Sequence, residues 1–453
     1  MSIPVSSFKI HIIHVGNMAN KGTQALLSSD VSMIRSIVGD GAVISVSTTD
    51  VAGVRKLGLP LAAVLPATVD IPYERADSLA KRFRYTRDSF RYKFFALCAL
   101  LLMLVQMSLS LVSIAFIKAG LKACYRPKVL ATVNDCDLVV SCSDENFKES
   151  ASMLPLNVYW VVAWWSMLLV RTWEILVAKS FGKPVIMFPN SMGPFRTAIG
   201  RLLSKIALSN CDSVLIREPI SYGIVESLMI RTPRILTSDT ALTLDTKCDL
   251  PFVKDTNGSI AVCPGLYAHS LPVRRVQQYI LDHAKALDKA IEKHGFSVVF
   301  LPHYISGFQF DDLDMCKLIT KRMEHSDKAR IIEAKDLGEF RSIVSQMDLI
   351  VSSKMHPAVL AASVHVPIVF VAYDHKQTGF AASLSLSDCV ISLHEVTCAR
   401  LFSKIDHVWN SKDEIKALLK ARVPELQKNV KKSIESAMAP FIRKNRCERL
   451  VTI

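Results

Sequence analysis

Short apolar runs alternate with longer amphipathic segments along almost the whole chain, and this alternation constrains the fold more than any other feature. Five runs in the first half have the composition of buried strands: FKIHIIHVG (8–16), AVISVST (42–48), CDLVVSC (136–142), KPVIMFPNS (183–191) and CDSVLIRE (211–218). A segment of helix length, residues 21–39, separates the first two. Strand, turn, helix and strand in repetition is typical of a doubly wound α/β domain. We therefore expect a Rossmann-like first domain at residues 1–245.

The same alternation begins again after a turn-rich segment, residues 245–258. Five further runs have strand length: SIAVCPG (259–265), FSVVFLPH (296–303), ARIIEA (329–334), MDLIVSS (347–353) and VPIVFVAY (366–373). A helix is expected at residues 276–295, where Gly295 ends the amphipathic pattern. We therefore expect a second α/β domain of the same kind at residues 257–400, followed by a helical tail at residues 401–453.

One apolar stretch interrupts the pattern of the first domain. Residues 94–117 contain no charge, glycine or proline, and at about 1.5 Å rise per residue a helix of this length can cross a bilayer. A single crossing would place strands of one sheet on opposite sides of the membrane. Basic residues also flank the stretch at both ends, so no inside or outside is defined. These are Lys81, Arg82, Arg84, Arg87, Arg91 and Lys93 before it, and Lys118, Lys122, Arg126 and Lys128 after it.

We therefore expect an apolar helical insert, about 81–128, that lies in the cytoplasmic leaflet with its basic flanks on anionic head groups. A buried core helix is the alternative.

Charge and cysteine usage limit the partners and the compartment. The net charge of +14 favours anionic partners such as phosphorylated metabolites or an anionic membrane surface. We find no arginine-rich arm or zinc-finger spacing, and so expect no nucleic acid partner. The eleven cysteines form no C-x-x-C pair, and the amino-terminal residues do not have the pattern of a secretory signal peptide. Both observations are typical of a cytoplasmic protein.

Glycine and asparagine residues follow the first strand, in HVGNMANKGTQALL. Backbone N–H groups and a helix amino terminus at such a place favour an anion or a polar ligand. Asn17 and Gly22 are therefore candidate substrate-binding residues. A turn that simply needs glycine is the alternative.

Two later strand ends of the first domain also carry polar residues. FPNSMGPF places Asn190, Ser191 and Gly193 where open α/β sheets bind ligands, unless the segment is only a loop. CDSVLIREPIS places Arg217 at a strand end, where it can hold a carboxylate or a phosphate through two parallel hydrogen bonds. An ion pair between Arg217 and Glu218, or another neighbour, is the alternative.

The second domain has histidines and lysines at its strand ends. His303 lies in FLPHY, and Lys354 and His356 lie at a strand–helix junction in SSKMHPAVL. AYDHK, after the next strand, adds Tyr373 and Lys376. A helix amino terminus there would add to the positive field, so these residues form a candidate anion site with a candidate general acid. A structural histidine and solvated turn residues are the alternatives.

Several common catalytic motifs are absent from the sequence. We find no metal-ligand cluster, no D-x-D, no G-x-S-x-G, no Walker motif and no carboxylate pair of the kind that glycosidases use. This argues against a serine hydrolase and against metal-dependent nucleotide chemistry. We expect no metal site.

Taken in order, these segments resemble the polysaccharide pyruvyl transferase family. The matching elements are HVGNMANKGTQALL, DLVVSCSDENF, VIMFPNSMGPF, SVLIREPIS, SDTAL, AVCPG, FLPHY and DLIVSSKMHPAVLAASVHVPIVFVAYDHKQTGF, which span about residues 8–380. The resemblance implies a fold like that of the GT-B glycosyltransferases, with two Rossmann-like domains facing a cleft. It also implies transfer of the pyruvyl group of phosphoenolpyruvate to two sugar hydroxyls, giving a ketal and phosphate. Phosphoenolpyruvate is then a donor substrate, and no metal or redox cofactor is expected.

The resemblance suggests roles for the candidate residues. His356 would be the general acid, while Arg217 and Lys354 would hold the carboxylate and phosphate of the donor. The substrate-binding candidates are Asn17, Gly22, Asp144, Asn190, Ser191, Gly193, His303, Ser353, Tyr373 and Lys376. The acceptor would be a sugar of a cell-envelope polysaccharide or of its lipid-linked precursor.

The chain departs from the family pattern at two places. Lys354 stands where family members usually have arginine, and a lysine lacks the planar fork that grips a carboxylate. Cys142 and Ser143 stand where many members have a Gly-Gly pair. Two other functions therefore stay open: a GT-B glycosyltransferase that uses a nucleotide sugar, and a catalytically lapsed scaffold of a glycan assembly complex.

Overall fold

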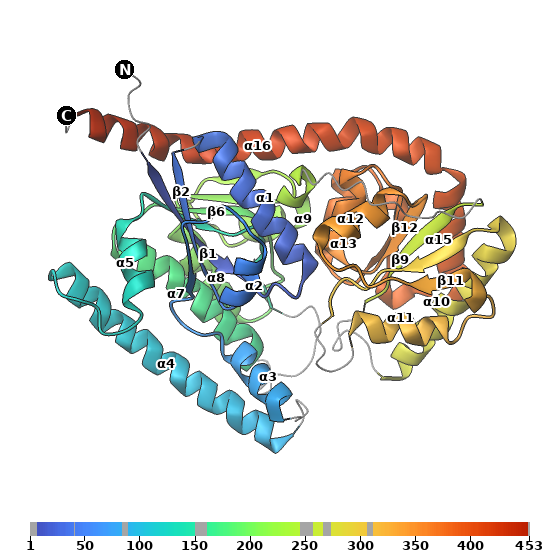
Figure 1. Cartoon of the computed structure of the whole chain (residues 1–453), viewed down its shortest axis with the longest axis horizontal. Helices are drawn as coiled ribbons and strands as arrows, with labels where there is room; N and C mark the ends of the chain where they lie inside the picture. Colours follow the sequence, from blue (N-terminus) through green and yellow to red (C-terminus); the bar gives the residue numbers. More distant parts are fainter. Residues whose placement is uncertain are drawn as a thin grey trace.

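A computed structural model of the chain describes residues 7–39, 41–83, 89–149, 161–244, 257–265, 273–305 and 311–451. Figure 1 shows two α/β units beside each other, with one long helix running along both. The expected boundary between the two domains, at residues 245–256, lies outside the described residues.

The first sheet has the strand order β3-β2-β1-β4-β6-β7-β8, with β5 beside β6, and all its described pairings are parallel. Its strands are β1 (Phe8–Val15), β2 (Ala42–Thr48), β3 (Ala63–Pro66), β4 (Leu138–Ser141), β5 (Asp144–Phe147), β6 (Val185–Met192), β7 (Ser213–Ile216) and β8 (Arg234–Leu236). The five strands expected in this half are present. The sequence pattern does not predict β3, β5 and β8, because β5 is polar and the edge strands β3 and β8 are only partly buried, whereas the equally short β4 and β7 are fully buried and largely apolar.

The second sheet has the order β11-β10-β9-β12-β13-β14 and is also parallel. Its strands are β9 (Ser259–Cys263), β10 (Ser297–Phe300), β11 (Ala329–Ile331), β12 (Leu349–Ser352), β13 (Ile368–Ala372) and β14 (Val390–Ser392). In both sheets the first strand is central, and the chain winds outward on one side and then on the other. This order is that of a doubly wound nucleotide-binding fold, which confirms the expected fold class.

Helices cover both sheets. Those of the first half are α1 (Lys21–Val38), α2 (Val51–Lys56), α3 (Pro72–Phe83), α4 (Phe90–Lys118), α5 (Pro127–Asp135), α7 (Ser166–Ser180), α8 (Ala198–Ser209) and α9 (Pro219–Glu226). Those of the second half are α10 (Val273–His294), α11 (Asp312–Thr320), α12 (Leu337–Ser345), α13 (Met355–Ser363), α14 (His375–Ser383), α15 (Cys398–Asn410) and α16 (Lys412–Val451). Short helical turns include η1 (Val161–Trp165) and η2 (Thr240–Thr243).

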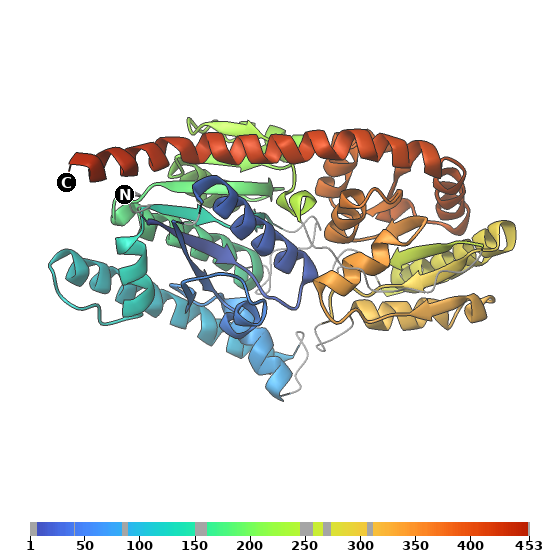
Figure 2. The same cartoon turned by 45° about the horizontal axis from the view of Figure 1, so that its top comes forward.

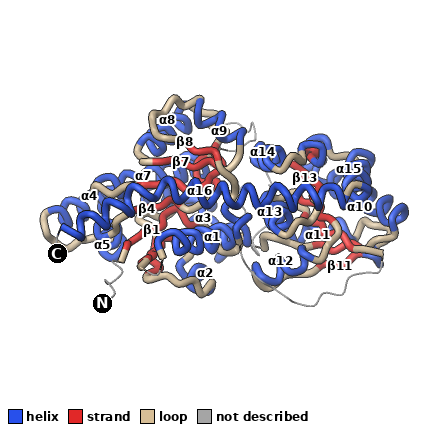
Figure 3. Tube along the Cα trace, turned by 90° about the horizontal axis from the view of Figure 1, so that it is seen from above, coloured by secondary structure: helices blue, strands red, loops and turns tan. Residues whose placement is uncertain are grey.

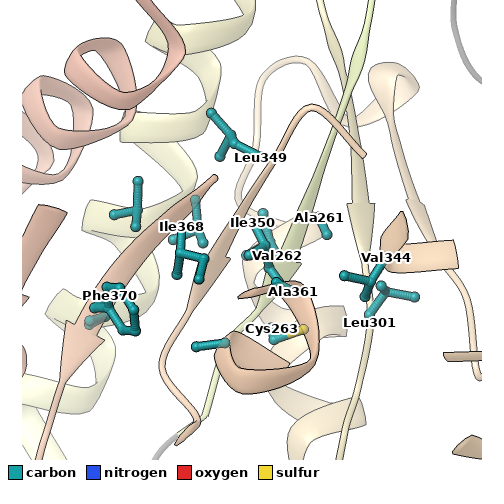
Figure 4. Packing of buried hydrophobic residues seen from close by; sticks show 14 of the residues in the cluster. Ala261, Val262, Cys263, Leu301, Val344, Leu349, Ile350, Ala361, Ile368 and Phe370 are labelled. Carbon is teal, nitrogen blue, oxygen red and sulfur yellow. The ribbon is translucent and has the colours of Figure 1, made fainter. Parts of the chain in front are cut away.

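The strands are buried on both faces, as expected for parallel sheets between layers of helices. In the second sheet, Val262, Ile350 and Phe370 come from three neighbouring strands and are at most 1% exposed. Figure 4 shows these side chains packing with Ala361 of α13. This core fixes the position at which α13 begins, and therefore the position of His356 in its first turn.

The carboxyl-terminal helix α16 connects the two halves. Leu419 and Val423 pack into the core of the second domain, and Val430 and Ile434 pack into that of the first. Figure 3 shows the helix running along both units, and Figures 1 and 2 show it on the side of the molecule away from α4. Residues Cys398–Asn410 and Lys412–Val451 form α15 and α16, and α16 packs against both cores.

The apolar stretch forms α4, which lies between α3 and α5 in the connection from β3 to β4. Among the described residues, α4 is the one helix long and apolar enough to cross a membrane, and 28% of its most apolar stretch is buried in the protein.

Candidate active site

The ends of strands from both sheets meet where the two domains contact each other. Asn20, in the turn after β1, forms an antiparallel bridge with Tyr304, which follows β10. Lys376 Nζ donates to Glu145 Oε2 across the interface at 2.5 Å. Most of the polar residues expected from the sequence lie at or behind this contact.

His356 is in the first turn of α13 and is buried against the amino terminus of α1. A Cβ atom on Gly22 would lie 2.2 Å from His356 Nδ1, so only glycine lets the two helices approach this closely. Burial, followed by the charge of Arg217, lowers the pKa of His356 to about 3, against the opposing charge of Asp144. The ring is therefore neutral at pH 7, and its Nε2 has no hydrogen-bond partner among the described residues.

Arg217 directly follows β7 and is 1% exposed. Its Nε donates to Ser191 Oγ at 2.8 Å, and one terminal nitrogen donates to Asp239 Oδ2 at 2.8 Å. The other terminal nitrogen, Nη2, has no partner within the described part of the chain. The buried partner of Arg217 is thus Asp239 and not Glu218, whose carboxylate caps α9 by accepting from Ser221 N. Two fixed contacts orient the guanidinium and leave one donor unused.

His303 lies beside His356 at the end of β10. The two rings are nearly parallel, with their centroids 6.5 Å apart, and the edge of Phe340 packs on His303. Burial, then the charges of His356 and Lys354, hold the pKa of His303 well below its usual value. Its Nε2 also has no partner among the residues described.

Lys354 points to a different part of the site from His356, although they are two residues apart. Lys354 Nζ forms an ion pair with Asp312 Oδ1 at 2.9 Å. Its side chain passes so close to Gly265 that a Cβ there would lie 2.3 Å from Lys354 Cε. The charge of Asp312 also acts on Lys21, whose pKa is lowered by burial. Lys21 and Lys354 thus form a basic group around one buried carboxylate.

A second charged group closes the interface on the side of α14. Glu145 accepts from Lys148 and Lys376, each at 2.5 Å, and Lys376 is only 4% exposed. Burial alone would lower the pKa of His375, but its hydrogen bond to Asp374 and the charges of Asp374 and Glu218 outweigh burial and raise it. Lys376 therefore holds the domains together and adds positive charge near His356.

Two other candidate residues, Asn190 and Ser353, hold structural contacts behind the site. Asn190 is fully buried and donates to the carbonyls of Cys142 and Phe188, which ties β4 to β6. Ser353 Oγ lies 2.8 Å from the hydroxyl of Tyr279.

The remaining candidates lie nearer the edges of the interface. Asn17 is exposed, and its side chain accepts from Ala19 N. Gly193 has φ +76° and precedes a cis-proline. The ring of Tyr373 lies under Lys376 Nζ, with 5.4 Å from the nitrogen to the ring centroid.

Ser143, at one of the two departures from the family pattern, has a structural partner. Its backbone N–H and its hydroxyl donate to the two oxygens of Asp30, both at 2.7 Å. Burial raises the pKa of Asp30 to about 6. The pair fastens the end of β4 to α1, and so supports the helix that carries Gly22.

Sequence reasoning did not select Asp239, Asp312, Glu145 and Lys21. Asp239 lies in the segment SDTAL and Glu145 in DLVVSCSDENF, two of the segments that carry the family resemblance, so the signal was present. Their roles depend on ion pairs between residues far apart in the chain, which spacing does not reveal.

No group of three or more His, Cys, Asp or Glu side chains that could hold a metal ion is found in the described ranges.

The buried histidines predict an acid-sensitive fold. Burial lowers the pKa of His11 and His283 to about 4, as it lowers that of His356 to about 3. Because these rings bind a proton in the unfolded chain near pH 6.5 and resist it in the fold, their contribution to stability is greatest above pH 6.5 and is lost as the pH drops towards 4. Each ring contributes on the order of 3 kcal/mol to this loss.

We expect the midpoint temperature of thermal unfolding to decrease when the pH is lowered from 7 to 4.5. This decrease should be smaller in the variant His283→Gln. An unchanged pH slope in that variant would contradict the assignment.

Comparison with known proteins identifies the family. The family model described as polysaccharide pyruvyl transferase matches residues 63–375, more than half of the chain. The chain belongs to this family. A curated relative, the amylovoran biosynthesis protein AmsJ of Erwinia amylovora, is 24% identical over 259 residues. That match covers 53% of this chain and 60% of the relative. The matched segment is less than two thirds of the relative's own length.

Solved structures share the fold at low sequence identity. A UDP-GlcNAc 2-epimerase from Neisseria meningitidis, bound to UDP-GlcNAc, has a TM-score of 0.56 at 11% identity, and covers 96% of this chain and 100% of its own. A glycosyltransferase from Rickettsia africae has a TM-score of 0.53 at 11% identity, and covers 97% and 99%. This similarity confirms the expected GT-B-like arrangement.

Proposed function

We propose that this pyruvyl transferase takes phosphoenolpyruvate as its donor and forms a ketal with two hydroxyls of a sugar, releasing phosphate. One observation carries the proposal: a buried histidine with an unused Nε2, His356, lies beside a buried arginine with an unused Nη2, Arg217. The first can transfer a proton, and the second can hold a carboxylate. The donor needs both.

The proposed reaction needs no redox step. His356, as imidazolium, gives a proton to the methylene carbon of phosphoenolpyruvate, which becomes a methyl group. The first sugar hydroxyl bonds to the central carbon and returns its proton to the imidazole. The second hydroxyl then bonds to the same carbon while the bond to phosphate breaks, and its proton leaves with the phosphate. Arg217 stabilises the negative charge of the carboxylate throughout.

Proton transfer from His356 requires a protonated ring, and binding of the anionic donor favours that protonated form. With only the protein's groups around it, the pKa of His356 is about 3 because of burial and Arg217. A nearby carboxylate and phosphate would favour the imidazolium and raise that pKa. Proton transfer is therefore coupled to donor binding.

The basic group around Asp312 is the proposed phosphate side of the site. Lys354 forms an ion pair with Asp312, and the charge of the same carboxylate acts on Lys21. An ammonium group binds a phosphate as a point charge, so Lys354 can serve here without the fork of an arginine. α13 also begins at Met355 without a side-chain cap, so its first N–H groups can take an anion.

A screen for ligands tests the proposal. The purified chain is heated with phosphoenolpyruvate, with UDP- or GDP-sugars, or alone, since a ligand of the native state raises the unfolding midpoint. Stabilisation by phosphoenolpyruvate, followed by phosphate release and a pyruvylated product with a suitable glycan, supports it. Binding of nucleotide sugars alone would replace it by the second candidate, a nucleotide-sugar glycosyltransferase, which the fold similarity also favours.

We also propose that the enzyme works at the cytoplasmic face of a membrane, on a cell-envelope polysaccharide or its lipid-linked precursor. The apolar helix α4 and the net charge of +14 support this location. Membrane binding without turnover on any donor would instead indicate the third possibility, a scaffold that has lost catalysis.

A further inference from the structure

Helix α4 buries a face that holds most of its small and polar residues and exposes most of its large apolar residues. The buried positions recur at intervals of three or four residues, as one face of a helix requires: Tyr92, Ala96, Ala99, Met103, Gln106, Ser110, Ser113 and Ile114. Polar members of this face are fully used. Gln106 accepts from Asp70 N at 2.9 Å and donates to Asp70 Oδ2 at 2.9 Å, and Ser113 Oγ accepts from Tyr125 N at 2.9 Å. This side of α4 is therefore a specific protein contact.

The opposite side, here called the outer face of α4, is apolar and exposed. It consists of Phe90, Phe94, Leu97, Leu101, Leu104, Val105, Leu109, Leu111, Val112 and Phe116, each 39% to 83% exposed. A soluble helix normally has the reverse pattern, with its large apolar residues inside. An exposed apolar face of ten such residues indicates a surface that is covered in use.

Basic residues lie at both ends of the outer face. Arg91 and Lys93 are exposed at its amino end, and Lys118 and Lys122 at its carboxyl end. No aspartate or glutamate occurs between residues 89 and 134. The charge therefore matches anionic lipid head groups at both ends, while the apolar residues match the acyl region between them.

We propose that the outer face of α4 lies flat in the head-group boundary of an anionic membrane. The helix cannot cross the bilayer in this fold, because its inner side packs against α3 through Ala96 and Tyr92 and binds Asp70 through Gln106. Basic residues at both ends also fit a helix parallel to the surface, since both ends then reach head groups of one leaflet.

The inference deepens the proposed function and rests on it for its purpose. In Figures 1 and 2 the amino end of α4 lies towards the junction of the two domains, and α16 lies on the other side of the first domain. A membrane below α4 would thus bring a lipid-linked sugar to the side of the junction that α16 leaves open.

Vesicle flotation tests the surface directly. The full chain is mixed with vesicles of phosphatidylcholine alone, or of phosphatidylcholine with phosphatidylglycerol, and the floating fraction is measured. We expect flotation with the anionic vesicles, weaker flotation at high salt, and little with phosphatidylcholine alone. An unbound wild-type chain would overturn the proposal.

Matched variants separate the surface from general effects. Leu101→Glu with Leu104→Glu should reduce flotation about tenfold or more, because two charges enter the apolar boundary. Leu202→Glu on α8 is the control, since Leu101 and Leu202 are both 57% exposed. Lys118→Glu with Lys122→Glu should also reduce binding, whereas Lys428→Glu with Lys432→Glu on α16 has the same charge change and should not. Equal losses in test and control variants would contradict the proposal.

The orientation has its own test. Lys93→Cys and Lys118→Cys are each labelled with a membrane-impermeant maleimide added outside the vesicles, and the labelled peptides are identified by mass. A helix in the membrane plane leaves both positions reactive, and native Cys98, which is exposed on α4, becomes protected. Protection of one end only would mean that the helix crosses the bilayer, and would overturn the flat placement.

Two further measurements keep this proposal apart from the catalytic one. His356→Ala should float like the wild type, and Leu101→Glu with Leu104→Glu should keep its stabilisation by phosphoenolpyruvate. A different result would point to a second copy of the chain: the wild type never floats but self-associates, and the double variant does not self-associate. That result would show that a second copy, and not a membrane, covers the outer face.

Discussion

Replacing His356 by alanine is expected to lower the proposed pyruvyl transfer by about 10²- to 10⁴-fold, the usual contribution of a general acid. The expected cause is chemical, because the variant removes the ring whose Nε2 lacks a partner in the described structure and leaves Arg217 held by Ser191 and Asp239. Stabilisation by phosphoenolpyruvate should therefore persist. The measurements are initial rates of phosphate release with saturating glycan, and thermal unfolding with and without donor.

His11→Ala is the matched control for loss of a buried imidazole. His11 is also buried with a lowered pKa, but its ring bonds to Ser45 and Ser47 within the first sheet. We expect the control to lose stability and to keep its rate per folded molecule. Full activity in His356→Ala would remove His356 from the mechanism, and His303→Asn would then test the neighbouring ring.

The arrangement of the sheets could be predicted because parallel strands buried on both faces leave apolar runs in the sequence. The edge strands β3, β8 and β14 and the polar strand β5 were not predicted, whereas β4 and β7, of four residues each, were predicted because their runs are largely apolar and fully buried. The path of α16 along both domains could not be predicted from the sequence either. Its apolar positions predict a helix, but Val430 and Leu419 do not indicate which of two domains each will contact.

The site was predictable where position alone decides. Arg217 directly follows a strand and His356 lies in the first turn of a helix, so the chain order places them at the edge of a parallel sheet. Their partners were not predictable, because Asp239 and Asp312 act on Arg217 and Lys354 through contacts that only the folded chain brings together. The outer face of α4 was half predictable: the sequence shows that the helix is apolar, but which residues it exposes becomes visible only in the structure, where Gln106 and Ser113 are buried.

The candidate site also depends on Gly22, although this residue has no side chain. Gly22→Ala should abolish most of the activity, because the added methyl group would lie 2.2 Å from His356 Nδ1 and 2.5 Å from Cγ of the same ring. Either the ring or the start of α1 must move, and a displacement of about 1 Å in a catalytic group can cost on the order of 10²-fold in rate. Overpacking should also lower stability, by about 1 to 3 kcal/mol.

Gly223→Ala on α9 is the control, since a Cβ there meets nothing within 4 Å. This variant should be as stable as the wild type or up to about 1 kcal/mol more stable, because alanine favours a helix over glycine. The decisive measurement is the double variant Gly22→Ala with His356→Ala. If the clash with the ring is the cause, removing the ring should restore the stability lost in Gly22→Ala, while activity stays at the level of His356→Ala. Additive losses of stability would show that Gly22 acts through the backbone of α1 instead.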